Sequence, residues 1–492
     1  MSISKFYENV DIFLTGGTGF LGKILIEKLL RSCNVRKIYI LVRCKKGKTV
    51  EERKEELLNC KIFEKVLLKN PDICNKVECI EGNICEENLG ISSSYMNLIR
   101  KNVSMVFHLA ASLKFNEPFP DSFVNNVEST KNLIQVCRQM ENLLVLVETS
   151  TAYSFCNNEE VNEKIYTMSR TYEEFKNLAN VRNNASVEVT DENILEGRPN
   201  TYALTKAIIE NYLNDFCRDL PLVIVRPSIV GCSWKEPIDG WNDSSTGANH
   251  LISAGMKGVL RTMLIDEDKY IDLVPADMVV NLLIAAAWKK AKIPHRRDDE
   301  IPIYNCTSRT INPLTWSEFT ELLHVNFWNY PPKSTFLYPT KFPKKNYYWN
   351  RLCIVMQHQF PAMLTDIFQL AMGRKPMMMN IYRRVHKTMK VLQYFCTREW
   401  MFHANNLEEL FKAMSTQDKQ NFNFDISKLN WNDYIKNYIL GFRRFVFKED
   451  DSTIPLSRKN LLMKYYIILF MKIGLLLAFL YSLIFRKIKF II

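Results

Sequence analysis

A tyrosine and a lysine four residues apart, in NTYALTK (200–206), are the first pair in this sequence that could do chemistry. Residues four apart share one face of a helix, so Tyr202 and Lys206 would be neighbours there. A phenol beside a cation can donate a proton, because the cation lowers the phenol pKa from its usual value of about 10. An isolated pair of this spacing is more often solvated helix surface. Whether this pair is catalytic therefore depends on the strands and helices around it.

A glycine-rich turn, GGTGFLG (16–22), follows the strand-like segment VDIFLT (10–15) and precedes the helical pattern KILIEKLLRSC. Glycines allow a tight turn and a close approach of backbone to pyrophosphate, and the helix N-terminus offers N–H groups to the anion. The strand–turn–helix order predicts a dinucleotide site rather than a mere tight loop. The turn fits G-x-G-x-x-G and a three-spaced version of it through Gly16, Gly17, Gly19 and Gly22.

The second predicted strand, KIYILVR (37–43), ends in a basic residue where NAD-binding folds carry an acidic one. A carboxylate at this place would repel a 2′-phosphate, whereas a guanidinium can pair with it in a bidentate way. Arg43 occupies the position, and Lys45 and Lys46 follow it. A basic surface loop is the plain alternative, but the position predicts NADPH as the cofactor.

The pattern continues with a helical stretch at 125–140 and four more strand-like segments. These segments lie at 76–84, 103–112, 143–154 and 220–231. This alternation predicts an α/β fold, a doubly wound parallel Rossmann sheet. Ligands of such sheets bind at the carboxyl ends of the strands. Ser150 or Thr151 ends one strand and the Tyr202–Lys206 pair opens the next long helix, so we expect all of them at that edge.

Length, composition and charge limit the classes of protein to which this chain can belong. A chain of 492 residues predicts at least two domains. Its 13 cysteines form no CxxC pair and have no histidine cluster beside them, so we expect reduced thiols and no metal site. The net charge is +12, but many basic residues flank the most apolar segment near the C-terminus, which favours a membrane surface over nucleic acid.

The C-terminal region contains helical patterns and then the apolar segment 465–485, which is long enough to span a bilayer. Lys472 interrupts this segment; a buried or interfacial helix is the alternative, but the lysine lies off centre and could reach the headgroups. We therefore expect a mostly α-helical domain over 350–448, a linker over 449–460 and a membrane anchor at 465–485. A tail so close to the C-terminus suggests a catalytic portion in the cytosol.

The motifs TGGTGFLG, HLAAS, TSTAYS, TYALTK and RPSIVG occur in the order of the extended short-chain dehydrogenase/reductase superfamily, which the first 310 residues resemble. Other motifs, EPIDGWND, GMKGVLR, DLVPADMVVN and HQFPAMLTDIFQLAMGRKP, resemble alcohol-forming fatty acyl-CoA reductases and their male-sterility-type C-terminal domain. The match spans nearly the whole chain. One departure is Asn83, where the family usually has aspartate near the adenine.

The resemblance implies NADPH-dependent reduction of long-chain acyl-CoA to a primary alcohol, with release of CoA after the first of two hydride transfers. It gives Tyr202 the role of acid, Lys206 a ribose contact, and Thr151, or its neighbour Ser150, the carbonyl oxygen. An endoplasmic reticulum or peroxisome membrane is implied, and the oligomeric state is left open. The implied cofactor contacts are Thr15, Gly16, Gly17, Thr18, Gly19, Phe20, Leu21, Gly22, Arg43, Asn83, Ile84, Ala110, Ala111, Asn126, Tyr202, Lys206, Arg226, Pro227 and Ser228.

Two alternatives belong beside this interpretation. An extended dehydrogenase acting on sterols or nucleotide sugars would share the N-terminal motifs, but the helical C-terminal domain argues against it. A non-catalytic membrane scaffold would need neither the glycine turn nor the Tyr–Lys pair. Asn126 is equally well explained as a ribose or water contact and as a polar residue at a helix start.

Overall fold

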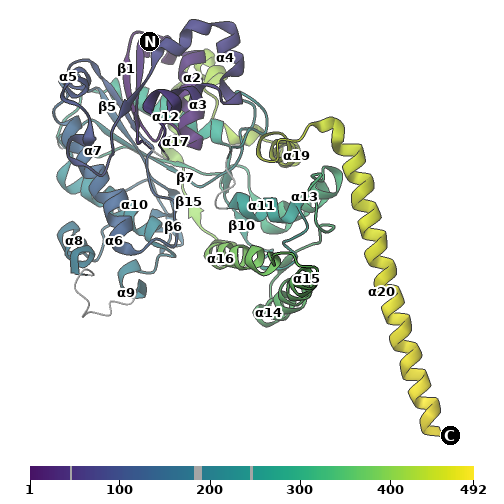
Figure 1. The fold of residues 1–492 in the computed structure, drawn as a ribbon. Helices are drawn as coiled ribbons and strands as arrows, with labels where there is room; N and C mark the ends of the chain where they lie inside the picture. The colour runs from purple at the N-terminus through teal and green to yellow at the C-terminus, as the bar shows by residue number, and fades with distance from the viewer. Residues whose placement is uncertain (45–46, 182–190, 244–247, 298, 492) are drawn as a thin grey trace. The chain divides into compact units, whose positions relative to one another are not determined.

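A computed structural model describes the backbone of residues 1–44, 47–181, 191–243, 248–297 and 299–491 (Figure 1). The chain forms two compact units, and each is assembled from separate segments. The first unit consists of Met1–Asn242, Tyr270–Leu314 and Arg398–Asn430, and the second of Asp243–Lys269, Thr315–Thr397 and Trp431–Ile492. The predicted division of the chain, by contrast, follows family resemblance and runs consecutively; it stays a prediction.

The first unit is built on a seven-stranded parallel sheet, which confirms the predicted fold class. Its order is β12-β7-β5-β4-β1-β2-β3. Each strand is mostly buried because helices cover both faces, as parallel sheets require. The strands are β1 (Asp11–Thr15), β2 (Lys37–Val42), β3 (Val77–Glu81), β4 (Met105–His108), β5 (Val145–Thr149), β7 (Leu222–Pro227) and β12 (Ile303–Cys306). β12 was not predicted from the sequence.

One face of the sheet packs on α5 (Ser93–Asn102), α7 (Ser129–Cys137) and α10 (Thr201–Phe216), whose apolar side chains form a single core with the strands. On the other face, α12 (Ala276–Ala291) contacts β5, β7 and α2 (Phe20–Ser32). Figure 1 shows these helices around the sheet. The remaining helices of the unit are α1 (Ile3–Phe6), α3 (Val50–Leu58), α4 (Glu64–Lys69), α6 (Phe119–Ser122), α8 (Tyr172–Val181), α9 (Asp191–Leu195), α17 (Asn405–Ala413) and α18 (Thr416–Asn421).

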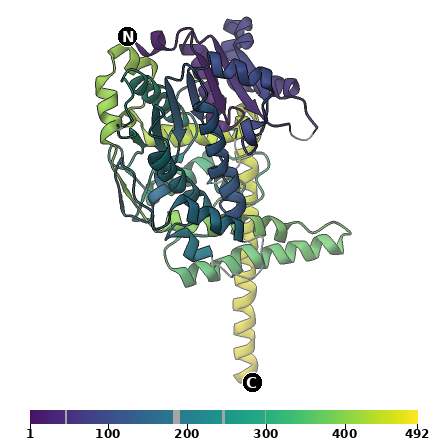
Figure 2. The same ribbon diagram turned by 90° about the vertical axis from the view of Figure 1, so that its left-hand side faces the viewer.

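The second unit is mostly helical, as predicted for the C-terminal region. A π-helical turn (Val355–Gln359) joins two of its helices, α14 and α15, into one continuous rod. Figure 2 shows α15 and α16 (green) side by side, and the two helices are in contact. The helices are α11 (Ala248–Met256), α13 (Trp316–Asn329), α14 (Tyr347–Ile354), α15 (Phe360–Ala371), α16 (Met378–Cys396), α19 (Trp431–Gly441) and α20 (Ile454–Ile491).

The chain ends in α20, and the predicted linker over 449–460 is wrong from residue 454 onward. Its first turns are part of the second unit: Leu461 is buried, and the Tyr465 ring lies 5.6 Å from that of Trp328. The stretch Asp451–Ser482 has a mean hydropathy of 1.9 in its most apolar window, only 6% of which is buried. By length and composition, this helix can cross a membrane. Lys472 donates to the Tyr338 hydroxyl at 3.3 Å.

Candidate active site

The carboxyl ends of neighbouring strands lie level, as expected from the sequence. Thr15 at the end of β1 is paired with His108 at the end of β4. His108 is paired in turn with Glu148 of β5, and Thr149 with Val225 of β7. Because β1 and β4 are neighbours that connect in opposite directions along the sheet, this edge is where a doubly wound fold binds its ligand.

The glycine turn is too tight for a side chain at Gly16 and Gly22. Gly16 has φ +75°, and a Cβ on it would lie 2.7 Å from the Ala110 nitrogen. A Cβ on Gly22 would lie 2.4 Å from the Gly16 oxygen. Gly19 is the N-cap of α2 and has no side chain to accept from the first amides of the helix. These amides can therefore bind an anion, and the turn fits the pyrophosphate of a dinucleotide.

Other residues predicted in the turn lie around it. Gly17 packs on Ile40 so closely that a Cβ would come within 2.6 Å of it. Phe20 stacks on Trp241 with ring centroids 5.2 Å apart, and Leu21 follows it, half-buried, in the first turn of α2. These contacts fix the entry of α2.

Arg43 is exposed directly after β2, where a 2′-phosphate contact is predicted. A second arginine, which the sequence analysis missed, connects it to the glycine turn. Arg53 of α3 donates to the Arg43 carbonyl oxygen at 2.6 Å and to the Thr18 hydroxyl at 3.4 Å. Lys45 and Lys46 lie outside the described residues.

The loops after β3 and β4 hold four more of the predicted cofactor residues. The Asn83 side-chain oxygen accepts from the Cys85 amide at 3.3 Å, so this asparagine shapes its own loop. Ile84 beside it is buried. Ala110 and Ala111 follow β4 and are partly exposed, next to the glycine turn.

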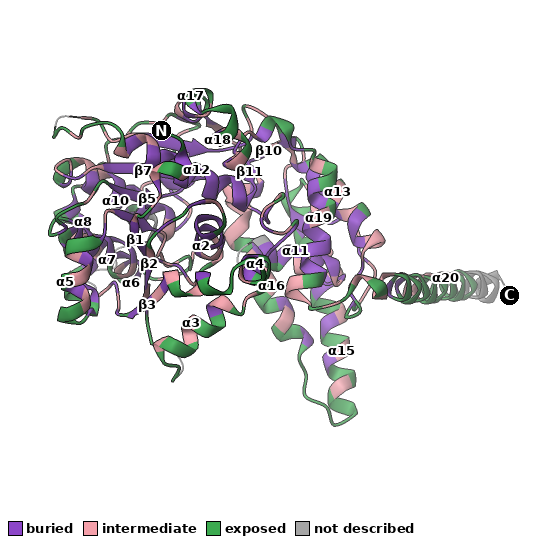
Figure 3. Cartoon of the chain, turned by 90° about the horizontal axis from the view of Figure 1, so that it is seen from above, coloured by how far each residue is buried: buried purple, intermediate pink, exposed green. Residues whose placement is uncertain are grey.

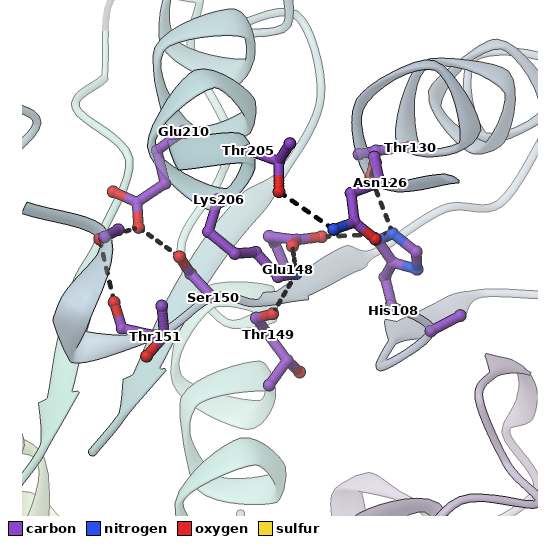
Figure 4. Close-up of polar contacts among 12 residues, drawn as sticks. His108, Asn126, Thr130, Glu148, Thr149, Ser150, Thr151, Thr205, Lys206 and Glu210 are labelled. Carbon is purple, nitrogen blue, oxygen red and sulfur yellow. Dashed lines mark hydrogen bonds and ion pairs between the residues drawn. The ribbon is translucent and has the colours of Figure 1, made fainter. Parts of the chain in front are cut away.

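The Tyr–Lys pair occupies the start of α10. Figure 4 shows Lys206 of this pair beside Glu148. The Asn200 side chain accepts from the Ala203 amide at 2.9 Å, which sets the first turn of the helix. Lys206 donates to a carboxylate oxygen of Glu148 at 2.8 Å and to the Thr149 carbonyl at 2.6 Å. Lys206 and Glu148 form a buried ion pair, since both side chains are only 2% exposed. Tyr202 is partly exposed, one turn away from Lys206.

The electrostatics of this pair differ from the sequence expectation. Burial raises the pKa of Tyr202; the Lys206 cation opposes this shift, and the Glu148 carboxylate reinforces it. Burial also raises the pKa of Glu148, against the influence of Lys206. The expected effect of Lys206 on the phenol is therefore present, but burial and Glu148 outweigh it.

His108 extends the buried network. Its Nδ1 lies 2.7 Å from the Thr15 hydroxyl and its Nε2 lies 3.0 Å from that of Thr130. The Thr130 hydroxyl donates to the Asn126 carbonyl, so it must accept from the imidazole, which fixes the proton on Nε2. Burial, with the nearby Lys206 cation, lowers the pKa of His108 to about 3, so the ring is neutral at pH 7.

The two candidate hydroxyls have different surroundings. The Ser150 hydroxyl donates to Glu210, so its proton is committed inside the protein. The Thr151 hydroxyl donates to the Pro227 carbonyl through a long contact of 3.4 Å and accepts from the Tyr153 amide. The Thr151 hydroxyl gives up only a long, weak hydrogen bond when it donates to another acceptor. This favours Thr151 over Ser150 as the hydroxyl that contacts the substrate.

Asn126 lies within a π-helical turn (Phe123–Glu128) and not at a helix start. Its side-chain oxygen accepts from the Ser112 amide at 2.7 Å, and its nitrogen donates to the Thr205 hydroxyl at 3.0 Å. The residue thus ties the loop after β4 to α10, beside Lys206.

Arg226, Pro227 and Ser228 cross the end of β7. The Arg226 guanidinium is fully buried and ion-paired with Glu210, and it also donates to backbone carbonyls. A cofactor contact by Arg226 would therefore involve its backbone. Ser228 is buried, and its amide donates to the Cys306 carbonyl of β12 at 3.0 Å.

Known proteins match this chain along most of its length. The family described as "Male sterility protein" matches twice, as an NAD-binding domain over residues 14–283 and as a second domain over 357–449. Fatty acyl-CoA reductase 1 of Rattus norvegicus is 38% identical over 466 residues, which cover 94% of this chain and 89% of the relative. The protein of that name in Homo sapiens is 38% identical over 462 residues, with the same coverage.

Among solved structures, the terminal R domain of the myxalamid PKS-NRPS biosynthetic pathway has a similar fold, with a TM-score of 0.59. It is 18% identical, and the match covers 89% of this chain and 92% of that one. At this identity the likeness concerns the fold alone.

Proposed function

Because this chain belongs to the fatty acyl-CoA reductase family, we propose that it reduces long-chain fatty acyl-CoA to the primary alcohol with NADPH. The chain is an oxidoreductase with a nicotinamide-cofactor domain. The observation that carries the proposal is the Tyr202–Lys206 pair at the strand ends, together with a glycine turn that leaves no room for a side chain at Gly16 and Gly22.

The cofactor is NADPH rather than NADH in this proposal. Arg43 is exposed at the end of β2, and Arg53 connects it to Thr18 of the glycine turn. Two guanidinium groups so placed suit a 2′-phosphate, which carries negative charge that the ribose of NADH lacks. The bound cofactor supplies hydride to the substrate carbonyl carbon.

The residues of this chain act on the carbonyl oxygen. Tyr202 donates a hydrogen bond, and then its proton, to the oxygen as negative charge develops there. Thr151 donates a second hydrogen bond to the same oxygen. Lys206 would hold a cofactor ribose if it exchanged part of its contact with Glu148, and its cation opposes the rise in the Tyr202 pKa.

The proposed reaction has two reductive steps. The first converts the thioester to a hemithioacetal, whose carbon–sulfur bond breaks to give CoA thiol and an aldehyde. The second reduces the aldehyde to the alcohol. Each step adds one hydride and one proton, so one acyl-CoA consumes two NADPH and two protons. The same donors serve both steps, because each develops charge on the same oxygen.

We also propose that α20 anchors the protein in an endoplasmic reticulum or peroxisome membrane, with the catalytic part in the cytosol. Residues 1–310 would form the catalytic domain, 350–448 the family's C-terminal domain and 465–485 the anchor. The apolar, mostly exposed part of α20 supports the anchor (Figure 3).

The test incubates the full-length protein in detergent with NADPH and a panel of acyl-CoAs, and identifies the products by mass spectrometry. The proposal expects fatty alcohol and free CoA. A sterol dehydrogenase would instead turn over sterols and leave acyl-CoA unchanged, and a scaffold would turn over neither. Either result contradicts the proposal.

A further inference from the structure

A second exposed apolar element lies in the second unit, apart from α20. Residues 352–373, which follow Arg351 in the α14–α15 rod, contain one acidic side chain, Asp366, and no lysine or arginine. Asp366 is buried and accepts from the amides at the start of α16, at 3.0, 2.8 and 2.9 Å. The Asp366 carboxylate is therefore satisfied by hydrogen bonds inside the hairpin and is not part of its outer surface.

The rod turns a polar and small-residue stripe inward and its large apolar residues outward. Cys353, His358, Ala362 and Asp366 are buried, at the spacing of one helix face. The outward side chains define what we name the apolar hairpin surface, and each is between 46% and 65% exposed: Leu352, Val355, Met356, Phe360, Met363, Leu364, Ile367, Phe368, Leu370 and Met372. Figure 3 shows exposed residues along α15.

Such a surface needs an explanation, because soluble proteins rarely expose contiguous apolar patches larger than a few hundred Å². Single exposed apolar residues are ordinary, but these follow one another along successive helical turns. Within the described residues, these side chains are not part of a protein core, because no described segment covers them.

The basic residues beside the apolar hairpin surface favour an anionic partner. The loop at the tip carries Arg374 and Lys375, and exposed basic residues continue along α16 at Arg383, Arg384, Lys387 and Lys390. No acidic residue occurs between 367 and 398. A second copy of the chain would bring these like charges together, whereas anionic lipid headgroups would neutralise them.

We propose that the apolar hairpin surface lies in the interfacial layer of an anionic bilayer, with the basic residues of α16 and the tip at the headgroups. An apolar helix face flanked by lysine and arginine is the pattern of helices that lie in this layer. The same unit contains α20, which by length and composition can cross a bilayer, so this contact rests on the anchor proposed above. This contact is independent of the reaction that the site catalyses.

The test reconstitutes the full chain into vesicles of phosphatidylcholine and phosphatidylserine that contain a photoactivatable phosphatidylcholine. Protein that floats with the vesicles is irradiated, and labelled peptides are identified by mass spectrometry. We expect label on 352–372 in addition to the α20 peptide. The exposed Leu68 and Leu113 of the first unit, at 78% and 62%, serve as the background for a non-membrane surface.

A triple variant, Leu364→Ser with Ile367→Ser and Phe368→Ser, tests the surface itself. These residues are exposed, so stability should change little. Label on the hairpin should fall to the background level while α20 stays labelled. The matched control, Leu68→Ser, should leave hairpin labelling unchanged.

Two results would overturn the proposal. The first is floated protein whose hairpin peptide is labelled no more than the background peptides. The second is a dimer in detergent that the triple variant abolishes, together with an unlabelled hairpin, which would assign the surface to a second copy.

Discussion

Replacing Lys206 should destabilise the protein as well as inactivate it. Lys206 and Glu148 lie 2.8 Å apart with both side chains 2% exposed. Removing one partner of a buried ion pair leaves the other charge unpaired and typically costs about 3–5 kcal/mol. Folded proteins are stable by only about 5–15 kcal/mol. Lys206→Met should therefore lose a large part of the total, although methionine fills nearly the same volume.

The assay is urea unfolding followed by tryptophan fluorescence, with activity measured in parallel. Lys206→Met should unfold at a clearly lower urea concentration than the parent. The double variant, Lys206→Met with Glu148→Gln, should recover most of that loss, because no charge is then left unpaired, yet it should stay inactive. A single variant as stable as the parent would show that the buried Lys206–Glu148 ion pair does not stabilise the fold.

The pH dependence of stability gives an independent check that the unpaired Glu148 carboxylate causes the loss in Lys206→Met. Burial holds the pKa of folded Glu148 above the ordinary value of 4.5. A group with a raised folded pKa stabilises the fold below its unfolded pKa, and that contribution is lost as pH rises through the folded pKa. Without Lys206 the folded pKa rises further. The stability deficit of Lys206→Met should thus shrink as pH falls from 7 towards 4.5, and that of the double variant should not.

Three further variants test the site and the anchor. Tyr202→Phe should lower kcat by about 10²- to 10⁴-fold while NADPH binding persists, and near-normal turnover would exclude Tyr202 as the acid. Arg43→Asp should weaken NADPH use more than NADH use, and equal rates with both cofactors in the parent would contradict the 2′-phosphate contact. Truncation after Tyr466, which keeps the packed start of α20, should release the protein from carbonate-washed membranes with NADPH binding intact; protein that still pellets would place the anchor elsewhere.

The sequence predicted the parts of the molecule that follow local rules. Six of the sheet strands were found from short apolar segments, since a buried parallel strand is apolar throughout. Asn200 capping places the helix start within a residue of the prediction. β12 was missed because Ile303–Cys306 is short and follows a polar stretch.

The candidate site was predictable in position but not in its electrostatics. Glu148 could have been noticed as a lone carboxylate in an apolar strand, but only the fold shows that it faces Lys206. Likewise His108 acquires its tautomer from Thr15 and Thr130, far away in sequence. Arg53 depends on how α3 folds back to the glycine turn. Each of these contacts is set by tertiary packing, which no local pattern encodes.

We propose that one site carries out both reductions of an acyl thioester. To test this, NADPH oxidised, CoA thiol released and product formed are measured from one long-chain acyl-CoA, with Tyr202→Phe as the inactive control. We expect two NADPH oxidised and one thiol released for each primary alcohol. One NADPH per thiol, with free aldehyde as the sole product, would contradict it.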